Sequence, residues 1–288
     1  MQKIGTVAIV GVGLIGGSIG LALRRLGLAD EIVGIGRRAT SLRKARQHGT
    51  VDRTTTDLER GVSQAELVVV CTPVNSIVPL IIRIGTSCRS GSLITDAAST
   101  KAEIVSSVDR QLNLGSAGHA PPARFVGSHP LAGDHRTGPE HARADLFEGH
   151  TVILTPTRNS RSKDVARLRQ FWSALGSEVV TMSAREHDRA LASTSHLPHL
   201  MASAISASTP RGYLPLVASG WLDTTRVAAG DPQLWCEILL SNRKHVLDSL
   251  SRVEKTINLL RASLENEDSR KLQQLLSKAK KIRDALGS

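Results

Sequence analysis

Apolar and polar positions follow two different patterns along the chain. Before Ser183, short apolar runs alternate with segments of helical spacing, and the runs predict strands at residues 7–10, 31–35, 66–71, 92–95, 151–154 and 178–181. Strands that alternate with helices are typical of a parallel sheet with helices on its faces. From Ser183 the pattern is helical almost to the end of the chain. We therefore expect an α/β domain followed by an all-helical domain.

The segments between these strands divide the chain further. Helices are predicted from the glycines after residue 10 to Leu26 and at residues 41–48, 76–86, 102–108, 165–175, 246–260 and 271–286. Residues 110–123 have the composition of a surface loop, and a short strand is expected to end at Gly127. Residues 155–162 are polar and contain a proline. This segment sets the expected boundary between a first domain, residues 1–157, and a second, residues 158–288.

Three glycines follow the first predicted strand in the order of a dinucleotide-binding turn. Gly11, Gly13 and Gly16 give the spacing G-x-G-x-x-G. Gly11 permits a tight turn, Gly13 lets the backbone approach a pyrophosphate, and Gly16 lets the helix pack against the strand. Leu14 and Ile15 open that helix, whose free N–H groups and dipole favour phosphate. This context predicts a Rossmann-type dinucleotide-binding domain; the alternative is a glycine-rich turn without a ligand.

Residues at the ends of two further strands extend the expected cofactor site. An acidic residue after the second strand of such a domain contacts the ribose of NAD, whereas basic residues suit the phosphate of NADP. Here Arg37 and Arg38 follow Gly36, and no acid is present. Because guanidinium binds phosphate bidentately, we predict NADP in preference to NAD. Otherwise these arginines are solvated loop charges. Thr72 and Pro73 follow another strand, at an edge where α/β sheets bind ligands.

Composition narrows the range of partners. The 288 residues carry a net charge of +11, but the basic residues are dispersed and only 2% of residues are aromatic. Because few side chains could stack on bases, we expect an anionic small molecule and cofactor, and no nucleic acid. No membrane-spanning run or signal-peptide pattern is present. The three widely spaced cysteines suggest reduced thiols in a cytoplasmic protein.

Two stretches outside the glycine turn carry candidate chemistry. In D-A-A-S-T-K, residues 96–101, Ser99 and Lys101 lie between a strand end and a helix start, where Ser99 is either a helix N-cap or a site residue. His129 follows a short strand and is held by glycine and proline. It lies in the half of a dinucleotide domain to which a nicotinamide would point, and histidine suits proton transfer near neutral pH.

Together these motifs resemble those of the prephenate and arogenate dehydrogenases of tyrosine biosynthesis. The resemblance rests on G-V-G-L-I-G-G-S at 11–18, D-A-A-S-T-K at 96–101, G-S-H-P-L-A-G at 127–133, S-H-L-P-H at 195–199, and D-T-T-R at 223–226 with D-P-x-x-W at 231–235. Five motifs in the family's order are far more specific than any one alone. The resemblance implies a homodimer formed through the helical domain. Because no regulatory or chorismate-mutase domain follows, we expect a monofunctional enzyme.

The reaction implied by the resemblance is an oxidative decarboxylation. Hydride leaves C4 of a cyclohexadienol ring for the nicotinamide, the ring carboxylate leaves as CO2, and the ring becomes aromatic. His129 matches the family's catalytic base for the C4 hydroxyl, and Ser99 matches the serine that bonds this hydroxyl. His196 and Lys101 are expected beside the substrate. Arg226 matches an arginine that binds a substrate carboxylate and can come from the partner subunit.

Several of these interpretations have alternatives. An ion pair with Asp223, three residues earlier on a helix, is the alternative for Arg226. Histidines on an apolar helix are commonly core residues, and a metal site is the rival for His196 and His199. Because the usual acidic partner is missing nearby, we assign no metal. Asp134 follows G-S-H-P-L-A-G directly. It would attract the ammonium of arogenate, or repel the carboxylates of prephenate unless a neighbour pairs it.

Two other functional classes share this architecture. A reductase similar to the β-hydroxyacid dehydrogenases would need a catalytic lysine in the helical domain, and no lysine lies beside S-H-L-P-H. A non-catalytic NADP-binding sensor would retain the glycine turn without needing both His129 and Arg226. The sequence therefore favours a dehydrogenase, with prephenate narrowly ahead of arogenate as the substrate.

Overall fold

All strands of the first sheet run parallel, and the strand order changes direction at the centre of the sheet. The computed structural model describes residues 2–114, 123–134 and 136–287. The six strands are β1 (Ile4–Val10), β2 (Ala29–Ile35), β3 (Arg53–Thr55), β4 (Leu67–Val70), β5 (Ser92–Asp96) and β6 (Ala123–Phe125), in the order β3-β2-β1-β4-β5-β6. The strand order reverses between β1 and β4, where sheets of this kind bind ligands at the carboxyl edge.

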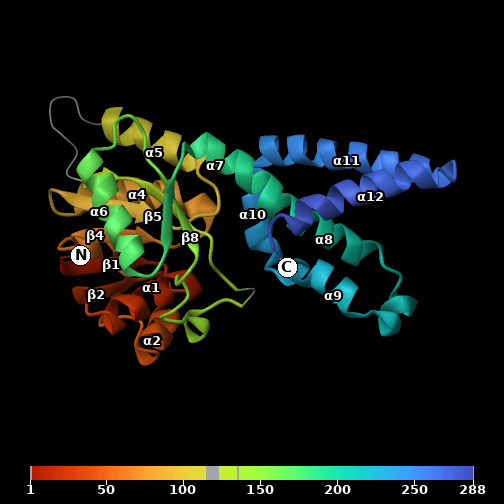
Figure 1. Cartoon of the computed structure of the whole chain (residues 1–288). Helices are drawn as coiled ribbons and strands as arrows, with labels where there is room; N and C mark the ends of the chain where they lie inside the picture. Colours follow the sequence, from red (N-terminus) through yellow and green to blue (C-terminus); the bar gives the residue numbers. More distant parts are fainter. Residues whose placement is uncertain (1, 115–122, 135, 288) are drawn as a thin grey trace.

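Helices cover both faces of this sheet (Figure 1). They are α1 (Leu14–Arg25), α2 (Ala39–Gln47), α3 (Leu58–Val62), α4 (Val74–Ser87) and α5 (Ala102–Leu114). Successive residues of β1 face opposite cores: Val7 and Ile9 pack with residues of α1 and α2, whereas Ala8 and Val10 pack with residues of α3, α4 and α5. Because both faces of β1 are buried over residues 7–10, this part of its sequence is a continuous apolar run without alternation.

A second sheet begins where the chain leaves the first. Residues 123–125 pair with β5 as β6, and β7 (Gly127–Pro130) then pairs antiparallel with β8 (Thr151–Thr155), which pairs parallel with β9 (Glu178–Thr181). The single residue Val126 between them still donates its N–H to Ile94 O at 3.1 Å. This continuous crossing from one sheet to the other carries His129 past the carboxyl end of β5.

The helix α6 (Ser162–Ala174) and strand β9 belong with the first domain. Leu168, Phe171 and Trp172 of α6 share one apolar core with Val7 and Ile9 of β1. This packing favours a boundary after Thr181 over the expected boundary between residues 157 and 158. We propose that the helical domain begins at Ser183, which caps α7 (Ala184–Leu191) in a capping box with Glu186.

The helical domain extends as two arms (Figure 1). One turn of π-helix (Ala192–His196) joins α7 to α8 (Leu197–Ser208), and the short segments η3 (Arg211–Leu216), α9 (Ser219–Thr225) and η4 (Arg226–Ala229) complete one arm. Helix α10 (Pro232–Ser241) returns to the first domain, where Ile238 joins the core formed by α4 and α5. The helices α11 (Arg243–Glu265) and α12 (Ser269–Asp284) form the other arm.

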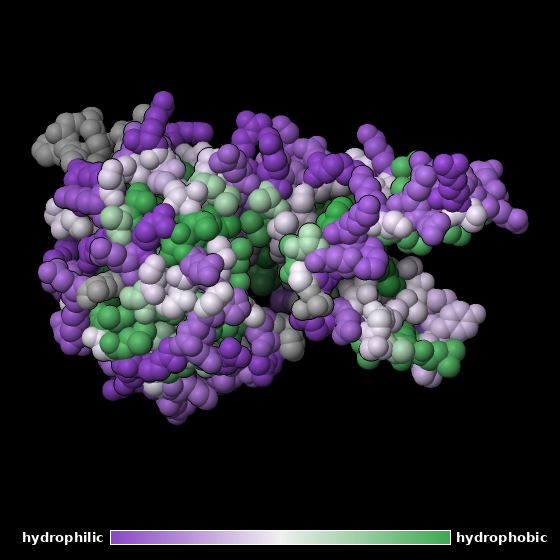
Figure 2. Space-filling view, in the orientation of Figure 1, coloured by the Kyte–Doolittle hydropathy of each residue, from purple (hydrophilic) through white to green (hydrophobic). Residues whose placement is uncertain are grey.

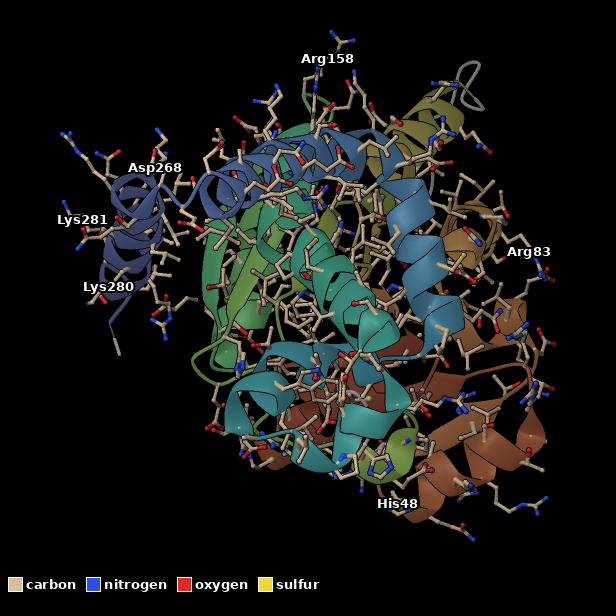
Figure 3. The ribbon with its side chains drawn as sticks, turned by 90° about the vertical axis from the view of Figure 1, so that its right-hand side faces the viewer. His48, Arg83, Arg158, Asp268, Lys280 and Lys281 are labelled. Atoms are coloured by element: carbon tan, nitrogen blue, oxygen red, sulfur yellow. The ribbon has the colours of Figure 1, made fainter. Side chains whose placement is uncertain are left out.

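The two arms expose many apolar side chains. Leu216, Leu264 and Ile282 are each at least 63% exposed, and α12 has no buried residue. Figure 2 shows hydrophobic residues on both arms beside the gap between them, whereas the outer side of the α11–α12 arm is mostly hydrophilic. Lys280 and Lys281 point away from the body of the molecule (Figure 3). A helix whose apolar side is left exposed is typical of an interface.

Most of the predicted elements are confirmed. The differences concern two short elements, the end of one helix and the place of His129. The α/β domain followed by helices is present as expected. The short elements β3 and α3 were not predicted, because β3 contains no apolar residue and α3 spans only five residues. Helix α5 continues to Leu114, so the expected loop at 110–123 is wrong over its first residues; residues 115–122 lie outside the described part of the chain. His129 lies within β7 and not after a strand. Among the described residues, no helix is long and apolar enough to cross a membrane.

The motif glycines give a prediction for stability. A Cβ at residue 16 would collide with the carbonyl oxygen of Gly11 and lie 2.8 Å from Ile9 Cγ2, whereas a Cβ at residue 13 has no atom within 4 Å. We expect Gly16→Ala to lower the free energy of unfolding by about 1–3 kcal/mol, because the helix must move off the strand. Gly13→Ala is the matched control and should unfold close to wild type in urea titration. Equal losses in both variants would contradict this account.

Candidate active site

The glycine turn forms a cradle that fits a pyrophosphate. Gly11 has a φ of +92°, and a Cβ there would lie 2.7 Å from the carbonyl oxygen of Cys71, so the loop passes directly over the end of β4. Gly13 precedes α1, whose first turn, including Leu14 and Ile15, contains no acidic residue. The open space at Gly13 lets a phosphate reach the free N–H groups of the helix. The residues present therefore fit a dinucleotide.

The neighbouring strand ends carry the other expected cofactor residues. Arg37 and Arg38 follow β2 and are exposed, and neither forms an ion pair within the described residues. Thr72 lies between β4 and α4, and its Oγ1 is buried without a hydrogen-bond partner there. Pro73 caps α4. Two exposed guanidinium groups beside a strand end, without an ion pair in the described part of the chain, suit a phosphate.

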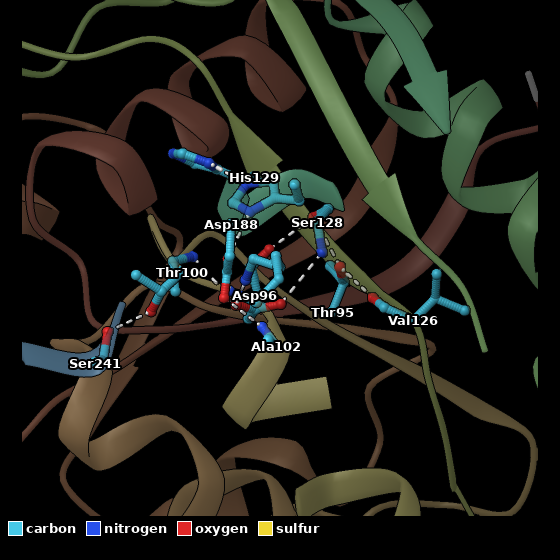
Figure 4. A network of polar contacts seen from close by, with 12 residues as sticks. Thr95, Asp96, Thr100, Ala102, Val126, Ser128, His129, Asp188 and Ser241 are labelled. Atoms are coloured by element: carbon cyan, nitrogen blue, oxygen red, sulfur yellow. Dashed lines mark hydrogen bonds and ion pairs between the residues drawn. The ribbon is translucent and has the colours of Figure 1, made fainter. Parts of the chain in front are cut away.

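A buried polar network lies at the carboxyl end of β5 (Figure 4). Asp96 accepts hydrogen bonds from the N–H groups of Ala98 at 3.1 Å and Ser128 at 3.2 Å, and it forms an ion pair with the Lys101 ammonium. Ser128 Oγ in turn donates to the carbonyl oxygen of Asp96 at 2.6 Å and lies 2.8 Å from Thr95 Oγ1. These bonds fix β7 against β5 and thereby position His129.

The interpretation of Lys101 as a substrate contact is wrong. Its side chain is completely buried and its ammonium is held by Asp96. Burial lowers the pKa of Lys101, although the attraction to Asp96 opposes this shift. An ammonium that is enclosed and already paired has no free face for a substrate carboxylate, so Lys101 stabilises the loop at residues 97–101 from within. Sequence spacing gave no indication of this burial.

His129 belongs to a chain of three side chains that joins the two domains. Its Nδ1 lies 2.8 Å from His187 Nε2, and His187 Nδ1 lies 2.8 Å from Asp188 Oδ1. Asp188 also accepts the N–H groups of Lys101 and Ala102, each at 2.8 Å, so this residue of α7 caps α5. Ser99 is half-buried, and no described residue hydrogen-bonds its hydroxyl, so the alternative that Ser99 caps the helix is not observed.

The electrostatics of the cluster keep His129 neutral. Burial lowers its pKa well below the usual 6.5, and the nearby His187, Lys101 and His196 act in the same direction. His129 is only 8% exposed, so its Nε2, which no described residue engages, can meet little except a bound molecule. A neutral histidine is a proton acceptor, and the expected role of His129 as a base therefore requires no prior deprotonation at neutral pH.

His196 lies on the other side of the same cluster and has an unused nitrogen. Its Nδ1 is 3.1 Å from Asn242 Nδ2, whereas Nε2 is buried and has no hydrogen-bond partner in the described chain. Burial lowers the pKa of His196 to about 4, whereas the nearby Asp188 and a weak hydrogen bond to the backbone of Ser99 oppose this shift. His196, Ser99 and His129 are therefore neighbours. His199 stacks on Trp235 with ring centroids 3.6 Å apart.

The structure does not bring every expected residue to this cluster. Arg226 is exposed at the start of η4, has no described contact with His129 or His196, and forms no ion pair with the equally exposed Asp223. Asp134 is exposed and ion-paired with Arg136, whose Nη2 lies 2.5 Å from Oδ2. Among the described residues, no group of histidine, cysteine and carboxylate side chains is arranged to hold a metal ion.

Four participants were not predicted as site residues. His187 and Asp188 lie on a helix where sequence reasoning favours a core role, and Asn242 stands at the junction of α10 and α11. The adjacent histidine and aspartate are the only sequence signal for the first two, and nothing in the sequence marks Asn242. Asp96 was included in the motif at 96–101 but was given no role.

Comparisons with known proteins agree with this geometry. The family model for the nucleotide-binding domain of prephenate dehydrogenase matches residues 19–181, and the model for its dimerization domain matches residues 183–278. Prephenate dehydrogenase of Bacillus subtilis is 33% identical over 98% of this chain and 76% of its own length.

Two solved structures extend the likeness to the whole fold. The prephenate dehydrogenase of A. aeolicus, in complex with hydroxyphenyl propionate and NAD+, has a TM-score of 0.88 at 32% identity, covering 99% of this chain and 98% of its own. The Synechocystis arogenate dehydrogenase has a TM-score of 0.80 at 29% identity, covering 98% and 99%. With both domain models matched in order and the two solved structures alike over at least 98% of their own chains, the chain belongs to the prephenate/arogenate dehydrogenase family of tyrosine biosynthesis.

Proposed function

We propose that this NAD(P)-dependent oxidoreductase converts prephenate to 4-hydroxyphenylpyruvate by oxidative decarboxylation. The observation that carries the proposal is the neutral, buried His129 beside Ser99 and His196 at the carboxyl edge of the dinucleotide-binding sheet. The bound nicotinamide supplies the hydride acceptor, and the residues of the chain supply proton transfer and orientation.

His129 acts on the hydroxyl at C4 of the ring. Its Nε2 accepts the hydroxyl proton as C4 is oxidised, and Ser99 Oγ, which no described residue engages, bonds the same oxygen. Loss of the ring carboxylate as CO2 then leaves an aromatic ring. Because His129 is nearly enclosed, water has little access to the proton it gains, and a base held in position contributes typically 10²–10⁴-fold to rate.

We also propose NADP as the preferred cofactor and a homodimer as the assembly. Arg37 and Arg38 supply two unpaired guanidinium groups where the 2′-phosphate of NADP would lie. The exposed apolar side chains of both arms and the match to a dimerization domain support association through the helical domain. Arg226, exposed and free of Asp223, is then available to a substrate carboxylate, either in its own subunit or in the partner.

Arogenate is the second candidate substrate, and Asp134 favours it. Asp134 lies in the loop after β7 with its side chain 23% exposed, and its carboxylate would attract the ammonium that distinguishes arogenate from prephenate. Arg136 pairs this carboxylate, which weakens both its attraction for an ammonium and its repulsion of the carboxylates of prephenate. The pairing therefore keeps prephenate in first place.

The substrate and cofactor assignments are tested together by initial rates at 340 nm. Prephenate and arogenate are each supplied with NAD or NADP, and we expect the highest kcat/KM with prephenate and NADP. Arg37→Ala and Arg38→Ala should each lower kcat/KM for NADP about 10–100-fold with little effect for NAD, because a charged hydrogen bond to phosphate is lost.

Arg158→Ala is the matched control, because Arg158 is an exposed arginine on the loop after β8. Figure 3 shows it far from His48, which ends the helix α2 that Arg38 begins. Activity with NAD alone would contradict the assignment of Arg37 and Arg38 to the 2′-phosphate. Turnover of arogenate alone would make arogenate the substrate in place of prephenate. Inactivity under all four conditions would refute the proposed function.

The shifted pKa of His129 predicts the acid limb of the pH profile. Only the neutral ring accepts a proton, so kcat/KM falls when pH drops below the pKa of this histidine in the free enzyme. Because burial depresses that pKa, the fall should be centred clearly below 6.5. We expect a constant kcat/KM from neutral pH down through 6.5, measured with NADP and prephenate. A midpoint at or above 6.5, in enzyme that recovers full activity on return to neutral pH, would contradict the assignment.

A further inference from the structure

We propose that Asp188 sets the position of the proton on both histidines of the site, through His187 for His129 and through Asn242 for His196. His129 then presents a lone pair at Nε2, and His196 presents an N–H at Nε2. The roles of the two rings rest on the proposed function, whereas the proton positions are properties of the free protein. His187, Asp188 and Asn242 are positioning residues in this proposal, because each acts through another side chain.

The first branch starts at the Asp188 carboxylate. Burial opposes its ionisation, but the hydrogen bonds from His187 and from the two backbone N–H groups of Ala102 and Lys101 outweigh burial and lower its pKa. An ionised carboxylate has no proton to donate. The bond of 2.8 Å between His187 Nδ1 and Asp188 Oδ1 therefore requires the proton to lie on His187 Nδ1.

The proton on His187 determines the proton on His129. Burial lowers the pKa of His187 despite its bond to Asp188, so the ring is neutral and its Nε2 carries a lone pair. The 2.8 Å contact with His129 Nδ1 must then be donated by His129. His129 is itself neutral, so its single proton lies on Nδ1 and its Nε2 is an acceptor. This is the state that a base for the substrate hydroxyl needs.

The second branch starts at the backbone carbonyl of the same residue. Asn242 Nδ2 donates to Asp188 O at 2.7 Å, which identifies this end of the amide as the NH2 group. The other hydrogen of the same nitrogen points to His196 Nδ1, 3.1 Å away. An amide nitrogen only donates, so His196 Nδ1 carries the lone pair. With a pKa of about 4 the ring is neutral, and its proton lies on Nε2.

The unpaired Nε2 of His196 distinguishes a binding group from a core residue. It is buried and has no hydrogen-bond partner in the described chain. A buried donor left without an acceptor destabilises the folded protein, so core histidines normally have both nitrogens satisfied. Here the backbone of Ser99 is at most a weak acceptor for this N–H, which also lies in the same cluster as His129. A substrate oxygen, carboxylate or carbonyl, is the chemistry that would satisfy it.

The two rings together recognise opposite hydrogen-bonding groups. His129 Nε2 takes a proton from a hydroxyl, and His196 Nε2 donates one to an oxygen that has no proton. A substrate that carries both a hydroxyl and an oxyanion on one ring meets both requirements. Asp188 also caps α5 by accepting the N–H groups of Lys101 and Ala102. The proton positions of the two histidines therefore depend on a residue at the junction of the two domains.

The direct test is nitrogen NMR of the free protein labelled with ¹⁵N-histidine. Protonated and unprotonated ring nitrogens resonate far apart, and long-range ¹H–¹⁵N correlations assign them to Nδ1 or Nε2. The variants His129→Asn and His196→Asn identify each ring by the signals that disappear. We expect the proton of His129 on Nδ1 and that of His196 on Nε2 at neutral pH. The reverse on either ring, or an even mixture, would overturn the proposal.

Two variants separate positioning from simple support of the fold. His187→Leu removes the acceptor for His129 Nδ1 and should lower kcat about 10–100-fold with a smaller change in KM, accompanied by a mixed tautomer signal for His129. Asn242→Leu removes the donor to His196 Nδ1 and should raise KM for prephenate by a similar factor, with a mixed signal for His196.

The controls make the same changes at exposed positions. His150→Leu and Asn266→Leu, whose side chains bond carbonyl oxygens at the surface, should leave both kinetics and tautomers as in wild type. Unchanged tautomers in the folded His187→Leu and Asn242→Leu proteins would refute the proposal. If a variant does not fold, the proton positions measured on His129 and His196 of the wild-type protein decide whether the proposal holds. Wild type that shows the expected tautomers but turns over neither substrate would refute the proposed function alone.

Discussion

The hydrogen bonds from the start of α5 to the Asp188 carboxylate are the contact on which the site depends. Its carboxylate accepts two backbone N–H groups of the first domain and the ring of His187, while its carbonyl holds Asn242 of the second domain. The free N–H groups of a helix end need acceptors when they are buried, and here a side chain from another domain provides them. The cap of one helix is thereby also the junction of the domains and the origin of the histidine network.

The rest of the molecule brings the other half of the site to this junction. The Rossmann-type sheet directs its carboxyl edge toward the helical domain, and the glycine turn lies there because Gly16 permits α1 to pack directly on β1. The strand that crosses from the first sheet to the second carries His129 to the same edge. Ser128, held by Asp96 and Thr95, stops that strand from sliding. The enclosed pair of Asp96 and Lys101 stabilises the loop that presents Ser99.

The sequence allowed local features to be predicted and left long-range contacts unseen. The glycine turn could be interpreted because strand, turn and helix are contiguous, and the functions expected of Gly11, Gly13 and Gly16 match the space around each. Ser99, His129 and His196 were singled out through motifs, and the structure brings them together. Lys101 was misjudged because a lysine in a motif gives no sign of whether its ammonium is enclosed. His187 is 58 residues from His129 in the chain, so only the fold reveals their bond.

The central claim is that His129, held at the junction of the two domains, accepts the substrate proton. The most direct test is stopped-flow measurement of a single turnover by His129→Asn, with NADP affinity measured on the same protein by fluorescence titration. The account predicts that the rate of hydride transfer falls about 10²–10⁴-fold while NADP affinity stays within about twofold, because the ring lies outside the glycine cradle. The control His150→Asn, which changes an exposed histidine of the same domain, should keep the wild-type rate of hydride transfer and the wild-type NADP affinity. A His129→Asn enzyme that transfers hydride at the wild-type rate would contradict the account.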